Sequence, residues 1–166
     1  HSFLYISVRT RYLCIEILKH IIMPYPEQLC APMRKELTSI GFTELKDAAQ
    51  VDATIPNSKG TLLLVMNSVC GCAAGAARPG VKLAIQNSEI KPDHLTTVFA
   101  GQDIEAVAQA RKYTLPYPPS SPCIALFKDG QLVHFVERHH IEGHSAEMIA
   151  ENLTAAFEEH CTTVNS

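Results

Sequence analysis

The chain has 166 residues, 46% of them hydrophobic, a length that suits one domain able to bury a core. Its formal net charge is -3, from 14 Lys and Arg residues against 17 Asp and Glu residues, and it contains no long basic run. Proteins that bind nucleic acid or an anionic membrane surface usually carry a basic patch, so neither partner is expected.

Cysteine usage favours a reducing compartment. Six cysteines in a chain of this length are too few for a small secreted domain held together by disulfides. The N-terminal stretch is apolar in places, but charges interrupt it, so it has neither a signal-peptide core nor a membrane-spanning length. We therefore expect a cytoplasmic protein. The interrupting residues are Arg9, Arg11, Glu16 and Lys19.

The first residues differ from the rest of the chain. Residues 1–22 carry no motif that indicates a function, and Met23, followed by Pro24, resembles a natural start. We expect residues 1–22 to be an N-terminal extension of uncertain origin, helical in part, and residues 23–166 to form a single domain.

An amphipathic helix is the first element expected in this domain. From Glu27 onward apolar residues recur at spacings of four, four and three, which places them on one face of a helix that Gly41 ends. A short strand over 42–45 and a short helix over 47–52 should follow, with a loop at 55–60. The predicted apolar face consists of Leu29, Met33, Leu37 and Ile40.

The central element is an unbroken apolar run over 61–66, which predicts a strand buried on both faces. Cys70, Gly71 and Cys72 come shortly after it, followed by an alanine-rich stretch of helical character. We expect the pair Pro79–Gly80 to kink that helix. The two thiols therefore lie at a strand-to-helix junction.

A second strand and helix follow. The residues 95–100 predict another buried strand, and Asp103 is expected to be the N-cap of a helix over 104–111. The order strand, helix, strand, helix indicates a parallel core.

The C-terminal part predicts a hairpin and a helix. The segment 114–122 is too rich in proline for a helix or an interior strand. The apolar runs 123–127 and 132–136 flank a Lys-Asp-Gly turn, which is typical of a hairpin. A final helix over 145–157 completes a ββα unit.

The strand-to-helix junction favours a reactive thiolate at Cys70. Unpaired N–H groups and the positive end of a helix dipole stabilise an anion, so the pKa of Cys70 should lie below that of a free thiol, about 8.5. A thiolate is the nucleophile of disulfide exchange. Cys72 already belongs to the helix, so Cys70 should be the more exposed thiol. A disulfide between them closes a small ring, for which the conformational freedom of Gly71 is useful.

Two other interpretations of the cysteine pair stay open. Free cysteines often act as small buried hydrophobic residues, so the pair could be incidental. The protein could also be a non-enzymatic metal-binding module that uses Cys70, Cys72 and nearby histidines. Structural zinc sites usually show a second Cys or His pair at regular spacing, which this sequence lacks. We expect no metal, and interpret the histidines of 138–144 first as solvated loop residues.

The order of elements and the position of the cysteines resemble the thioredoxin fold. In that fold a cis proline precedes the first hairpin strand and lies against the active-site sulfurs, a position that Ser121–Pro122 matches. Several stretches resemble the bacilliredoxin family, over about residues 23–161. They are Pro32–Thr38, Asn67–Gly75, Ala77–Pro79, Val98–Asp103, Ser120–Pro122, Val133–Phe135 and Ile141–His144.

This resemblance implies an α/β thioredoxin-like fold, with a central mixed sheet flanked by helices and a C-terminal ββα unit. It implies a thiol-disulfide oxidoreductase that removes bacillithiol from mixed disulfides on client proteins. Cys70 would be the nucleophile and Cys72 the resolving thiol. Bacillithiol would be a co-substrate with no cofactor bound, and the partners would be bacillithiolated clients and a recycling reductase. A general thioredoxin-like disulfide reductase or isomerase is the alternative.

Other residues are expected to support the site or bind substrate. Asn67 and Ser68 could donate hydrogen bonds to the Cys70 thiolate, although polar residues at strand ends more often satisfy backbone groups. The loop 138–144 borders the active-site face in a thioredoxin fold, so His139, Glu142 or His144 could contact the client or bacillithiol. The supporting and binding residues expected are Gly71, Pro122, Ser121, Asn67, Glu142 and Gly143.

Cys123 departs from the family pattern, in which we expect a residue without a thiol, such as serine, after the proline. We interpret it as a buried core cysteine; a third sulfur within the site would put a simple two-thiol cycle in doubt. Cys14, Cys30 and Cys161 are interpreted as incidental.

Overall fold

The computed structural model describes residues 24–161, so the expected extension over residues 1–22 lies outside the described part. None of the described helices combines the length and apolar character needed to cross a membrane. The elements in chain order are α2 (Glu27–Thr38), β1 (Thr43–Glu44), α3 (Ala48–Thr54), β2 (Thr61–Asn67), a π-helix η1 (Ala73–Ala77), α4 (Arg78–Asn87), β3 (His94–Phe99), α5 (Ile104–Tyr113), β4 (Cys123–Lys128), β5 (Gln131–Val136), α6 (Arg138–Ile141) and α7 (Ala146–His160).

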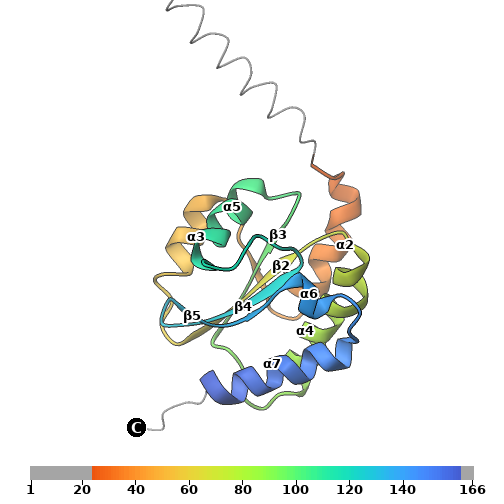
Figure 1. The fold of residues 1–166 in the computed structure, drawn as a ribbon. Coiled ribbons are helices and arrows are strands. Elements are labelled where there is room, and N and C mark those ends of the chain that lie inside the picture. Colours follow the sequence, from red (N-terminus) through yellow and green to blue (C-terminus); the bar gives the residue numbers. More distant parts are fainter. Residues whose placement is uncertain (1–23, 162–166) are drawn as a thin grey trace, which may run out of the picture.

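The strands form one mixed sheet in the order β1-β3-β2-β4-β5 (Figure 1). The pairs β1/β3 and β2/β3 are parallel, whereas β2/β4 and β4/β5 are antiparallel. The predictions of a parallel core, a C-terminal ββα unit and a mixed α/β sheet are confirmed. Strand β2 lies at the centre, with all its residues buried, so its C-terminal end is a rigid platform for the cysteine loop.

Helices cover both faces of the sheet. Helices α3 and α5 pack on one face, and α4 and α7 pack on the other (Figure 1). Alternate residues of β2 enter two separate hydrophobic cores, Leu63 and Val65 on the α4/α7 side and Leu62 and Leu64 on the α3/α5 side. This explains why the run is apolar without alternation.

The buried face of α2 agrees with the predicted one only in part: Leu37 is fully buried and Ile40 packs against the core. Leu29 is 47% exposed, whereas Cys30, Arg34 and Leu37 are the buried residues of this helix. Arg34 can be buried because three carboxylates surround it and its guanidinium lies 4.9 Å from the centre of the Phe99 ring. The apolar periodicity did not place Arg34 on this face, because the burial of an arginine depends on carboxylates from other elements.

One of those carboxylates belongs to Asp103. Asp103 precedes α5, as predicted, but its side chain makes no capping bond to the helix. It instead accepts two hydrogen bonds from Arg34, at 2.7 and 3.0 Å. The charged pair outcompetes the cap because both oxygens bind a buried guanidinium.

The helix after the cysteines accommodates its proline through a change of helix type. Residues Ala73–Ala77 form a π-helix, and α4 begins at Arg78, so Pro79 stands near the start of α4. A proline is tolerated near a helix start, where its missing N–H has no partner to lose. The π-helical segment ends at Ala77, two residues before the proline at which a kink was expected.

The hairpin β4/β5 is present as predicted, and the Ser121–Pro122 bond before it is cis, as predicted. The region after β5 differs from the expected loop, because Arg138–Ile141 form the short helix α6. Ser145 caps α7 by accepting a hydrogen bond from the Met148 N–H. Helix α6 stands between β5 and α7 in the chain (Figure 1).

Candidate active site

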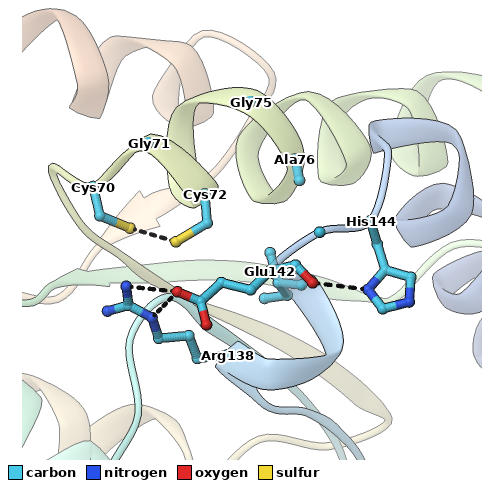
Figure 2. Close-up of a pocket in the computed structure, with 10 residues that line it drawn as sticks. Cys70, Gly71, Cys72, Gly75, Ala76, Arg138, Glu142 and His144 are labelled. Atoms are coloured by element: carbon cyan, nitrogen blue, oxygen red, sulfur yellow. Dashed lines mark hydrogen bonds and ion pairs between the residues drawn. The ribbon is translucent and has the colours of Figure 1, made fainter.

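The two cysteines lie where β2 ends and a helix begins. The Cys70 carbonyl accepts the N–H groups of Ala73 and Ala74 at 3.1 and 3.2 Å, which closes the first helical turn. Both thiols are free, and their sulfurs are 2.8 Å apart (Figure 2). The Ser68 hydroxyl donates to the Cys70 sulfur at 3.1 Å. The loop thus brings two thiols and a hydroxyl donor into contact.

The surroundings favour a thiolate at Cys70. Partial burial raises its pKa, but hydrogen bonds from the Cys72 and Ser68 side chains and from the backbone N–H groups of Ala73 and Cys72 outweigh burial and leave the pKa lowered. Hydrogen bonds to the charged form of an acid lower its pKa. The direction agrees with the prediction made for a thiol at a helix start.

Cys72 has the opposite character. Burial, its hydrogen bond with Cys70 and the charge of a Cys70 thiolate all raise the pKa of Cys72, and Arg138 opposes them. Both thiols are half-buried, so the expected difference in exposure does not distinguish them. They differ in electrostatics and packing, since Cys72 contacts the hydrophobic core on the α4/α7 side. This asymmetry suits one nucleophile and one resolving thiol.

Asn67 supports the site without touching the sulfur. Its amide donates to the Met33 carbonyl, and its Oδ1 accepts from the Ser68 N–H at 2.9 Å. The expected donation from Asn67 to Cys70 is thus not observed, and Asn67 satisfies backbone groups, the alternative role; Ser68 is the residue that donates to the sulfur. Arg78, only 3% exposed, donates to Asn67 Oδ1 at 3.1 Å and to the Ser68 carbonyl at 2.9 Å.

Arg78 was missed as a site-supporting residue because nothing in its sequence position indicates burial. Its Nε also donates to Glu36 at 2.8 Å, which ties α2 to the start of α4. A buried arginine with three acceptors holds the segment before Cys70 in one conformation.

A cavity of about 510 Å³ opens beside the sulfurs. Glu142 and Gly143, both expected at the site, line it. The full lining comprises Cys70, Gly71, Cys72, Gly75, Ala76, Arg138, Ile141, Glu142, Gly143 and His144. The structure therefore joins the cysteine loop to the segment after β5, as the fold resemblance implied.

Arg138 is the second residue that sequence reasoning missed. It donates to Glu142 Oε1 from Nε and Nη2 at 3.0 and 2.9 Å (Figure 2). Its Nη1 donates to the Ser121 carbonyl at 3.2 Å. A signal was present, because Arg138 and Glu142 are four residues apart with opposite charges. Ser121 thus supports the site through its backbone, and Pro122, next to it, leads into β4 beside Met66 and is not part of the cavity lining.

Gly71 is not needed for a left-handed backbone in the dithiol form. Its φ is not positive, and a Cβ added there would meet no atom within 4 Å. Its predicted role, to relieve the small ring of a disulfide, concerns the oxidised form and stays a prediction.

Cys123 is a core residue, as interpreted. It packs in the core on the α3/α5 side of the sheet and does not line the cavity. Burial raises the pKa of its thiol to about 12. Cys30 and Cys161 are also buried, and burial raises the pKa of each. Cys14 lies outside the described residues.

The histidines after β5 divide between two places. His144 lines the cavity, and its Nδ1 bonds to the Glu142 carbonyl at 3.1 Å. His139 instead lies against His140, with ring centres 3.9 Å apart. Within residues 24–161, the group of three possible metal ligands within 4.8 Å of one another is Glu137, His139 and His140, and it contains neither Cys70 nor Cys72.

Ser68→Ala is expected to raise the pKa of Cys70, because it removes a hydrogen bond to the thiolate. The rate of iodoacetamide alkylation against pH reports this pKa, and the wild-type midpoint should lie below that of a free thiol. Ser39→Ala, at an exposed serine that ends α2, is the matched control. An unchanged midpoint in Ser68→Ala would show that the hydroxyl does not stabilise the thiolate.

Solved structures confirm the fold. The chain superposes on a thioredoxin mutant from Halobacterium salinarum with a TM-score of 0.52, at 17% identity, covering 75% of this chain and 95% of that one. Mitochondrial thioredoxin 3 from Saccharomyces cerevisiae gives a TM-score of 0.50 at 18% identity. The superposition covers 75% of this chain and 98% of the thioredoxin. The predicted thioredoxin-like fold is confirmed.

Sequence relatives identify the family. A family model described as disulphide isomerase matches residues 25–161. A bacilliredoxin from Cytophaga hutchinsonii is 62% identical over 135 residues, which cover 81% of this chain and 98% of the relative. The bacilliredoxin from Geobacillus kaustophilus is 52% identical over 137 residues, which cover 82% of this chain and 94% of the relative. The chain therefore belongs to the bacilliredoxin family of thiol-disulfide oxidoreductases.

Proposed function

We propose that the protein reduces mixed disulfides between bacillithiol and client proteins. One observation carries the proposal: two free thiols with opposite pKa shifts meet beside an open cavity of about 510 Å³. The cavity volume falls in the range of about 300–1,000 Å³ that is typical of small-molecule sites. Membership of the bacilliredoxin family is the reason for choosing bacillithiol as the small thiol in this proposal.

The first step transfers bacillithiol to Cys70. The Cys70 thiolate attacks the bacillithiol sulfur of the mixed disulfide, a new S–S bond forms, and the client leaves as a thiolate that takes a proton from water. Ser68 holds the thiolate in place until it reacts. The client is then free and Cys70 carries bacillithiol.

The second step releases bacillithiol. Cys72 loses its proton to solvent and attacks the Cys70 sulfur, and bacillithiol leaves as a thiolate that is then protonated. The two thiols have given two electrons to the mixed disulfide and are now joined as a disulfide. A recycling reductase in the cytoplasm returns those two electrons.

Cys72 attacks as a thiolate, so its pKa must be lower at this step than it is in the dithiol form. In the dithiol, burial and the neighbouring thiolate raise the pKa of Cys72. Once Cys70 is bonded to bacillithiol its negative charge is gone, while Arg138 still favours a thiolate at Cys72. The order of the two steps therefore follows from the charges.

The residues around the sulfurs have separate roles in this proposal. Glu142 and Gly143 contact the bacillithiol held on Cys70, because they line the cavity. Ser121 and Pro122 present the backbone before β4 to the client, and Gly71 lets the disulfide ring close.

A disulfide isomerase is the second candidate, since the matching family model carries that description. The same Cys70 thiolate would then attack a protein disulfide, and a client thiol would release it in place of Cys72. No net electrons would be transferred to the client.

The decisive experiment compares two adducts of one carrier protein that has a single cysteine, modified with either bacillithiol or glutathione. Bacillithiol is expected to be released at least about tenfold faster than glutathione. This ratio corresponds to a difference of about 1.4 kcal/mol between the two activation free energies. Equal rates, or faster release of glutathione, would contradict the proposal and leave a general reductase. Reactivation of a scrambled protein without release of either thiol would favour the isomerase.

A further inference from the structure

The cavity beside the sulfurs carries charged groups that disulfide exchange does not require. Gly75 and Ala76 form one wall, with nothing larger than a methyl group, and Arg138 and Glu142 lie across from them (Figure 2). A small thiol attached to Cys70 would therefore have space on one side and charges on the other.

The Arg138–Glu142 pair is exposed at the cavity, with 44% and 53% of the two side chains accessible, and its hydrogen-bonding groups are not all engaged. An arginine has five N–H donors, and three atoms of Arg138 are engaged, by Glu142 Oε1 twice and by the Ser121 carbonyl. Two of its N–H groups thus have no protein acceptor among residues 24–161. Both bonds to Glu142 end on Oε1, which leaves Oε2 without a donor in the same residues. The pair can therefore accept one ion of each sign.

The charge of Arg138 reaches the sulfurs. The hydrogen bond to Glu142 is the main cause that raises the pKa of Arg138, and the charges of Cys72 and Cys70 add to it. Because Cys70, Arg138 and Glu142 line the same cavity, a group attached to Cys70 also lies near the guanidinium and the carboxylate. His144 also belongs to the lining, and its ring points toward the Glu142 carbonyl (Figure 2).

We propose that the Arg138–Glu142 pair selects the small thiol of the mixed disulfide, and that it favours thiols carrying both an ammonium and a carboxylate group. Glu142 Oε2 accepts the ammonium, and the two unengaged N–H groups of Arg138 bind the carboxylate. This inference rests on the proposed function in one respect, that a small thiol is transferred to Cys70.

Four mixed disulfides on one single-cysteine carrier test the proposal. Cysteine carries both charges, cysteamine the ammonium only, 3-mercaptopropionate the carboxylate only, and 2-mercaptoethanol neither. Each rate is divided by the rate at which dithiothreitol reduces the same adduct, which removes differences in intrinsic reactivity. Wild-type protein is expected to prefer each charged group by about fivefold, so the cysteine adduct reacts fastest.

Two variants test which residue recognises the ammonium group and which recognises the carboxylate group of the small thiol. In Glu142→Gln, the rate ratio of cysteine to 3-mercaptopropionate should fall to about one, because the acceptor for the ammonium is weakened. In Arg138→Gln, the rate ratio of the cysteine adduct to the cysteamine adduct should also fall to about one, because the group that binds the carboxylate is removed. Glu151→Gln, at an exposed position of α7, should keep both ratios.

Three outcomes separate this inference from the proposed function. Equal normalised rates for the four adducts in wild-type protein would overturn the charge selection and leave disulfide exchange intact. Ratios that survive in both variants would overturn the assignment to Arg138 and Glu142. Removal of none of the adducts would contradict the transfer to Cys70 itself, and the selection with it.

Discussion

Cys70→Ser is expected to slow the release of bacillithiol from a modified client by at least about a thousandfold. A serine hydroxyl supplies no nucleophile comparable to a thiolate at neutral pH, whereas the structure lowers the pKa of Cys70. The rate of free bacillithiol formation with a recycling dithiol present measures the effect. Cys72→Ala should still take bacillithiol from the client once, but should lose most of its turnover.

The control for both variants is Cys123→Ala. Cys123 is 3% exposed and lies outside the cavity, so its loss should leave the rate close to that of the wild type. An active Cys70→Ser protein together with an inactive Cys72→Ala protein would reverse the two roles. A large loss in Cys123→Ala without unfolding would show that a third thiol takes part.

Arg78→Met is expected to lower the free energy of unfolding by about 2–4 kcal/mol. The substitution keeps much of the side-chain length but removes the hydrogen bonds to Glu36, to Asn67 and to the Ser68 carbonyl. The buried Ser68 carbonyl then loses this donor. Urea-induced unfolding of the reduced protein measures the change.

Lys82→Met is the matched control for this variant. Lys82 is exposed on the same helix, so its replacement should change the free energy of unfolding by no more than about 0.5 kcal/mol. Since Arg78 positions the segment that carries Ser68, Arg78→Met should also raise the pKa of Cys70 in the alkylation assay. Unfolding midpoints that match for the two variants would show that the Arg78 network is not stabilising.

The elements that sequence alone predicted correctly are those with a local cause. The apolar run of β2 predicted a doubly buried strand, the Asp-Gly turn predicted the β4/β5 hairpin, and the cysteines at the strand-to-helix junction predicted a lowered pKa at Cys70. Each depends on residues close together in the chain.

The features that the sequence did not predict share a different cause, which is the pairing of side chains from distant segments. Arg34 is buried because Asp103, 69 positions away, binds it, and this added an unpredicted charged residue to the buried face of α2 and removed a helix cap. Arg78 reaches back to the end of β2, and Arg138 approaches the cysteines only once β5 has paired with β4. No local pattern in the sequence contains these contacts.

The most direct test is the intact mass of Cys72→Ala after incubation with a bacillithiolated client. Cys70 should accumulate one bacillithiol, located by peptide mapping, and the client should be recovered with a free thiol. A covalent complex between the protein and the client would show that Cys70 attacks the client sulfur instead. An unmodified protein beside an unchanged client would contradict the assignment of Cys70 as the thiol that receives bacillithiol.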